Sequence, residues 1–171
     1  MIPRAILSWT LVLLLFGCAS APLLPTRPPL AQIEQFTFSG RIAVRQGEMR
    51  HHARIDWRHE AERDEILLTT PLGQGVAELT RDAGGARLLL ADQRRFTADD
   101  WNSLSQQVFG FPLPLSAATR WLLGDLTETA GWRVTVVARE SAAADALPTE
   151  IELERDDIAV LLRIDEWSEV R

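Results

Sequence analysis

Three histidines come closest in this sequence to a metal-binding pattern. His51, His52 and His59 fall within one short segment, and imidazole nitrogen is a common zinc ligand. The segment alternates apolar and polar residues, which predicts a β-strand with neighbouring side chains on opposite faces. His51 and His52 therefore cannot share one ion, and we expect no metal site.

Acidic side chains are the other candidates for chemistry. Paired carboxylates could support hydrolysis, and the sequence has two adjacent acidic pairs, Asp64-Glu65 and Asp156-Asp157. No serine, cysteine or histidine motif accompanies them, and they border predicted strands, where charges are normally solvated. We expect no enzymatic activity and no cofactor.

The single cysteine has a more specific context. Arg4 precedes an apolar run from Ala5 to Phe16 that is too short to span a bilayer and has the pattern of a secretory signal. The run ends in LFGC, which is similar to the bacterial lipobox despite the large Phe16, and the cysteine of that motif becomes the lipidated first residue. We therefore expect residues 1–17 to be a signal peptide and Cys18 to be a lipid anchor. Ala19 favours the outer membrane, because aspartate at this position commonly signals inner-membrane retention.

Composition limits the remaining possibilities. Removal of residues 1–17 leaves 171 − 17 = 154 residues, enough for one domain with a packed core. No second cysteine is present, so no internal disulfide can form, and the net charge of −6 argues against binding nucleic acid. Four prolines between Ala21 and Pro29 favour an extended tether. We expect a tether at 18–32 and a single, monomeric domain at 33–171.

Period-two alternation predicts most of that domain to be antiparallel strands. In FTFSGRIAVR, the apolar residues Phe36, Phe38, Ile42 and Val44 share one face. Similar alternation occurs in HARIDWR, DEILLTT, VAELT and ARLLLA, and again in WRVTVVAR and around Ile151. The last strand, IAVLLRIDEW, is more uniformly apolar, which favours a central position in the sheet.

Two helices are predicted between these groups of strands. We expect Thr97 to cap the first, which carries Trp101 and Leu104 on its apolar stripe, and Ser116 to cap the second, which carries Trp121. Helices with an apolar stripe must cover the open side of such a sheet. The predicted fold is mainly β with two or more short helices (α+β), an open, incomplete antiparallel β-barrel with a helical lid. Whether its interior is filled or hollow stays open on these grounds.

One predicted hairpin connection has an unusual composition. Pro71, Leu72 and Gly73 fall between the strands DEILLTT and VAELT, where a turn usually carries polar residues. Proline and glycine suit a tight turn, but leucine in water forgoes roughly 1.5–3 kcal/mol of burial. Leu72 either folds back onto the rim of the barrel or serves an apolar partner.

An ordered set of motifs is similar to the outer-membrane lipoprotein receptor family LolB. The segments are FSGRIAV, Trp57, LLTTPLGQGVAEL, RFTADD and FPLPLSAATRWLLG, between about Phe36 and Gly124 and behind a lipobox. Phe16 and the pair Gln74-Gly75 depart from the family pattern. The resemblance implies an apolar cavity that accepts acyl chains of lipoproteins from a soluble periplasmic carrier, LolA, and releases them into the outer membrane, on whose periplasmic face the protein is anchored.

The resemblance also implies roles for particular residues. The loop Pro71–Gly73 would deliver cargo into outer-membrane lipid, with Leu72 as the inserting side chain. The apolar positions of the strands and helices would contact acyl chains, and we expect these contacts from Phe36, Phe38, Ile42, Val44, Ile55, Trp57, Leu68, Leu104, Trp121 and Val134. The alternative is a structural envelope lipoprotein with a filled core, which a cavity of several hundred cubic ångströms would argue against.

Overall fold

A computed structural model of the chain describes residues 27–129 and 131–171. The predicted signal peptide, Cys18 and most of the tether lie outside these residues. Leu30–Gln32 form a short 3-10 turn, η2, rather than the extended tether predicted there, and Leu30 packs against the core. Ile33 is buried, at the position where the sequence predicts the folded part to begin.

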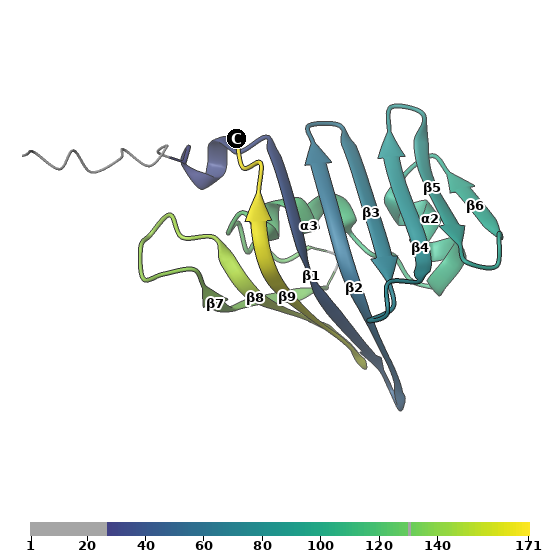
Figure 1. Cartoon of the computed structure of the whole chain (residues 1–171). Coiled ribbons are helices and arrows are strands. Elements are labelled where there is room, and N and C mark those ends of the chain that lie inside the picture. The colour runs from purple at the N-terminus through teal and green to yellow at the C-terminus, as the bar shows by residue number, and fades with distance from the viewer. Residues whose placement is uncertain (1–26, 130) are drawn as a thin grey trace, which may run out of the picture.

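One antiparallel sheet forms the centre of the molecule (Figure 1). Its nine strands among the described residues are β1 (Gln35–Gln46), β2 (Met49–Glu60), β3 (Arg63–Thr69), β4 (Gly75–Asp82), β5 (Gly85–Leu90), β6 (Arg95–Ala98), β7 (Arg133–Arg139), β8 (Pro148–Arg155) and β9 (Ile158–Ser168). The order is β6-β5-β4-β3-β2-β1-β9-β8-β7, so β6 and β7 are edges and the sheet is not closed. The predicted mainly-β class with an open antiparallel sheet is confirmed, as is the central position of the last strand.

Strand β9 approaches β1 very closely at one point. A Cβ atom added to Gly40 would lie 2.2 Å from the backbone oxygen of Arg163, so only glycine fits there. The register between β1 and β9 shifts between Ser39 and Gly40, as in a β-bulge. A bulge increases local twist, which helps the sheet to curve around its inner face.

Two helices in the described part of the chain cover that inner face, α2 (Trp101–Phe109) and α3 (Leu115–Leu122) (Figure 1). The predicted cap of the first helix was wrong. Asp100 is the N-cap, and its side chain accepts a hydrogen bond from the Ser103 backbone N–H, whereas Thr97 belongs to β6. In α3 the N-cap is Pro114, and Ser116 lies inside the helix without a capping bond.

Candidate functional site

An apolar cavity of about 500 Å³ lies between the sheet and the two helices. Strands β1 to β5, β8 and β9 form one wall, and α2, α3 and the segment between them form the other. Apart from Gln46, His51 and Ser105, the lining consists of aliphatic and aromatic residues. The volume falls in the range typical of small-molecule and lipid-sized pockets, about 300–1,000 Å³. A pocket with this volume and lining has the size and the apolar character that suit a hydrocarbon ligand.

The cavity opens at one end of the sheet. Along β2 the inward-facing residues Trp57 and Ile55 are buried, His51 is exposed and Met49 at the hairpin tip is 57% exposed. The wall residues Val76 of β4 and Phe109 of α2 are exposed as well. Because β2 and β3 are antiparallel, the exposed start of β2 and the end of β3 lie toward the same end of the sheet. The mouth is therefore on the side of the β1–β2 turn and the β3–β4 loop.

Seven of the ten predicted acyl-contact residues line the cavity. They are Ile42, Val44, Ile55, Trp57, Leu68, Leu104 and Trp121. They come from β1, β2, β3, α2 and α3, so the tertiary fold brings together positions that the alternation and helical periodicity had marked separately.

The other three predicted residues, Phe36, Phe38 and Val134, do not belong to the lining of this cavity. Phe36 and Phe38 share the inner face of β1 but lie at its closed end, where they pack with Trp57 and with Trp167 of β9, the ring centres of Phe38 and Trp167 being 5.2 Å apart. Val134 is buried on the edge strand β7, beyond β8, where the wall ends.

Several wall residues were absent from the predicted set. Strands β4, β5 and β9 contribute Leu79, Leu88 and Val160, and the α2–α3 connection contributes Phe111 and Leu113. The strand residues carry the same alternation that identified Ile42 and Val44, so the sequence contained a usable signal for them. The connection residues had no such signal, because FPLPL has no regular period.

The β3–β4 loop presents Leu72 to solvent. The backbone N–H of Gly73 donates to the Thr70 carbonyl at 2.9 Å, which closes a tight turn, and Gly73 has a φ of 84° that favours glycine. The Thr70 N–H donates to the Gln74 carbonyl at 2.8 Å and ties the base of the loop. Leu72 is 91% exposed, so it does not fold back onto the rim. The loop is thus an ordered turn that carries an apolar side chain outward on the side of the mouth.

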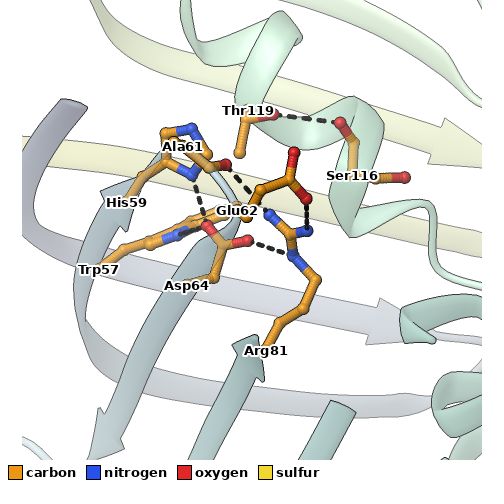
Figure 2. Close-up of polar contacts among 8 residues, drawn as sticks. All are labelled: Trp57, His59, Ala61, Glu62, Asp64, Arg81, Ser116 and Thr119. Carbon is orange, nitrogen blue, oxygen red and sulfur yellow. Dashed lines mark hydrogen bonds and ion pairs between the residues drawn. The ribbon is translucent and has the colours of Figure 1, made fainter. Parts of the chain in front are cut away.

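A buried charge cluster lies on the same inner face of the sheet, beyond the closed end of the cavity toward the β2–β3 turn; Figure 2 shows its polar contacts. Asp64 is completely buried, which corrects the expectation that it is a solvated charge at a strand end. Trp57 Nε1 donates to Asp64 Oδ1 at 3.0 Å, His59 Nδ1 lies 2.7 Å from the same oxygen, and Arg81 Nε donates to Oδ2 at 2.7 Å. Burial alone would raise the pKa of Asp64, but these hydrogen bonds outweigh it and hold the pKa below its usual value.

This cluster connects three strands. Asp64 belongs to β3, Arg81 to β4, and Trp57 to β2, and the Arg81 guanidinium also reaches the Ala61 carbonyl at the β2–β3 turn. Trp57 takes part in both the cluster and the cavity wall. The hydrogen bond to Asp64 therefore fixes the indole that forms part of the wall.

The remaining histidines do not combine into a metal centre. His51 lines the cavity, whereas His52 lines a depression on the outer face, so the two point to opposite faces of β2 as predicted. Within residues 27–129 and 131–171, no group of three or more histidine, cysteine or acidic residues is arranged to hold a metal ion. Over the same residues, no helix has the length and apolar character needed to cross a membrane.

Comparison with known proteins identifies the family to which this chain belongs. The family described as outer membrane lipoprotein LolB matches residues 34–167. This chain belongs to the LolB family. A LolB relative from Chromobacterium violaceum is 36% identical, covering 96% of this chain and 98% of the relative. The LolB of Azoarcus sp. is 31% identical over 90% of this chain and 89% of the relative, and that of Dechloromonas aromatica is 33% identical over 92% and 94%.

Membership confirms the resemblance found in the sequence and extends it. The motifs read from the sequence end near Gly124, whereas the LolB match continues through β7 and β8 to Trp167 in β9. The LolB relatives named above are outer-membrane lipoproteins, in agreement with the lipobox-like LFGC at Cys18.

Proposed function

We propose that this LolB-family protein is an outer-membrane-anchored receptor that accepts the acyl chains of lipoproteins from a soluble LolA-like periplasmic carrier and inserts them into the outer membrane. The cavity of about 500 Å³ between the sheet and the helices is the observation that carries the proposal. An unfilled interior loses packing contacts and therefore lowers stability. A scaffold that only bridges envelope components does not need a cavity and gains nothing from it that would offset this loss. The cavity thus favours the receptor over the structural lipoprotein.

The composition of the wall supports acyl binding rather than catalysis. The wall consists of side chains that suit hydrocarbon, such as those of Ile42, Leu68, Leu104 and Val160. The buried carboxylate of Asp64 is not part of the lining and already accepts hydrogen bonds from Trp57 and its other donors. Helices α2 and α3 act as a lid in this proposal. Transfer from the carrier needs no nucleotide, because a cavity that binds cargo about 1.4 kcal/mol more tightly than the donor gives a tenfold bias. One domain supplies the whole wall, so the proposed receptor acts as a monomer.

Release of cargo is assigned to the β3–β4 loop. Leu72 is 91% exposed and lies toward the same end of the sheet as the cavity mouth. One apolar side chain cannot anchor a protein, but on a protein already held by a lipidated Cys18 it can enter the bilayer surface and bring the mouth against lipid. Pro71 and Gly73 keep the turn in the shape that holds the leucine outward.

A two-step assay tests the proposal. The purified receptor is mixed with a carrier–lipoprotein complex, cargo capture is measured by pull-down, and cargo insertion is then measured by flotation with liposomes. Leu72→Glu should leave capture unchanged and lower insertion by about tenfold or more, because burying a leucine side chain is worth about 1.5–3 kcal/mol. Leu72→Phe should retain much of the insertion.

Val137→Glu provides the matched control. Val137 is also exposed, at 53%, but it lies in the edge strand β7 near Arg139, away from the mouth. It should not affect either step. Failure of the unmodified protein to capture cargo would reject the receptor, and loss of both steps or of stability in Leu72→Glu would show that Leu72 is a packing residue.

A further inference from the structure

The cavity wall contains very few polar side chains, and two of them lie together on the β1–β2 hairpin. Tryptophans apart, the polar wall residues are Gln46, His51 and Ser105. Ser105 is buried and already engaged, since its hydroxyl donates to the Asn102 carbonyl at 3.0 Å and accepts from the Leu113 N–H at 2.8 Å. Gln46 and His51 are accessible to solvent and remain available to a ligand.

Both residues sit at the mouth. Gln46 is the last residue of β1, His51 is near the start of β2, and the register pairs Gln46 with Met49 and Val44 with His51. The two side chains are therefore diagonal neighbours on the inward face of the β1–β2 hairpin, within reach of one ligand. Deeper on the same face the wall continues with Val44, Ile42 and Ile55, all apolar.

The two arginines nearest to the β1–β2 turn, Arg45 and Arg50, lie on the opposite face of this hairpin. Arg45, Arg50 and His52 line a shallow depression on the outer face of the sheet, together with Glu152. The inward face of the mouth thus offers hydrogen-bond donors without a fixed positive charge from these arginines. Such a surface suits an uncharged acceptor, such as a carbonyl oxygen, better than a phosphate, for which arginine is the preferred partner.

A lipid that enters the cavity has a carbonyl group where each acyl chain begins. The methylenes contact the apolar wall, and the ester or amide oxygen stays near the mouth, where loss of water without a new hydrogen bond is unfavourable. The Gln46 amide offers two N–H donors, and the His51 imidazole offers at least one in either tautomer.

We propose that Gln46 and His51 form a carbonyl-binding collar that donates hydrogen bonds to the ester or amide oxygens of the bound lipid. This inference rests on the proposed acyl-binding function and adds a specificity to it. The collar makes the cavity selective for acyl chains, which carry a carbonyl, over plain alkyl chains of the same length. It also fixes the depth at which the chains stop.

Two chain-matched lipids test the collar. Dipalmitoylglycerol carries two ester carbonyls, and dihexadecylglycerol is the ether analogue without them. Binding of each to the full chain carrying Cys18→Ser is measured by displacement of anilinonaphthalene sulfonate. The protein with an intact collar should prefer the ester by roughly thirtyfold, the value expected for two hydrogen bonds of ordinary net strength.

Variants assign the preference to the two residues. The double variant Gln46→Leu, His51→Leu should bind both lipids with a ratio near one, and its affinity for the ether should not fall. His52→Leu, one residue away on the outer face, should keep the full preference. Because both substituted side chains are accessible at the mouth, circular dichroism should show an intact fold.

The possible results separate this inference from the function on which it rests. Binding of both lipids with no ester preference, or an unchanged preference in the double variant, would overturn the collar and leave the acyl-binding cavity standing. Binding of neither lipid by the folded protein would overturn both. Loss of the preference in His52→Leu as well would also overturn the collar, because the effect would not follow the inward face.

Discussion

The distance between the tether and the β3–β4 loop gives a quantitative prediction. The described chain enters the domain through η2, beside the C-terminus and at the end of β1 away from the mouth (Figure 1). Glu34 and Gln35 both bond to the Arg171 carbonyl there. If Cys18 is anchored in the membrane that receives cargo, the tether must let the domain turn so that Leu72 reaches the same surface.

The register gives the required span. Gln35 pairs with Glu60 at the tether end of β2, and Arg54, six residues earlier, pairs with Thr69 just before the loop. Six residues of strand cover about 20 Å, and the loop extends further, so Leu72 is roughly 30 Å from the tether end. The extended part of the tether ends where η2 begins, and the 30 − 18 = 12 steps from Cys18 to Leu30 reach at most about 40 Å. The tether is long enough, but not by a wide margin.

Deletion of residues 19–26 should therefore block insertion. It leaves 12 − 8 = 4 extended steps before η2, which reach about 15 Å at most and cannot span the distance. A linker that cannot span two sites gives an effective concentration near zero. Replacing residues 19–32 with an equally long Gly/Ser sequence should give an intermediate rate, because a flexible chain of 15 steps has a typical end-to-end distance of only about 20 Å.

Flotation of cargo with liposomes measures the insertion rate, with no more than one receptor per vesicle so that transfer between vesicles does not contribute. Capture from the carrier in solution should be equal for all three proteins, since the tether lies outside the wall. Insertion by the deletion variant at the rate of the unmodified protein would refute the idea that the anchor and Leu72 act on one membrane.

Two further predictions concern the cavity wall and the charge cluster at its closed end. Ile42→Asp should weaken cargo capture at least tenfold in a protein that remains folded by circular dichroism, because a carboxylate in the apolar wall disfavours hydrocarbon; normal capture would remove Ile42 from the binding surface. Asp64→Ala should lower the free energy of unfolding at pH 7 by about 3–5 kcal/mol, because it leaves the Arg81 side chain without its buried partner. Since the folded-state pKa of Asp64 is lowered, its contribution is present above the unfolded carboxyl pKa near 4 and is lost as the pH falls through the folded value. Urea titrations should thus show the difference between variant and parent shrinking from pH 7 to pH 3, and a constant difference would contradict the assigned role.

Local patterns were sufficient for most of the secondary structure. The apolar alternation predicted β1 to β5, β7 and β8, because one face of each strand must be buried and this shows in successive residues, and a more uniformly apolar run predicted β9. Strand β6, only Arg95–Ala98, was missed because four residues carry too little periodicity. The helix caps were misplaced by a few residues for a related reason, since Thr97 and Asp100 are both acceptable capping residues and only the backbone path decides between them.

The sequence also determined which strand residues face the interior, but not which of them pack in the core and which line the cavity. Phe38 and Ile42 lie on the same face of β1, and periodicity treats them as equal. In the fold, Phe38 is packed among the rings of Phe36, Trp57 and Trp167, whereas Ile42, four residues further along β1, lines the cavity. The volume of that space depends on distances between elements far apart in the chain.

Two features, the burial of Asp64 and the exposure of Leu72, were decided by the tertiary structure alone. From the sequence, Asp64 is expected to be a solvated charge at a strand end. In the fold, the pairing of β3 with β4 places Arg81, 17 residues later, beside its carboxylate. Leu72 could have folded back or projected outward, and the turn closed by Thr70 and Gly73 holds it outward. The sequence determines the type of each side chain and the local pattern around it. Whether that side chain is buried or exposed depends on which distant parts of the chain the fold places next to it.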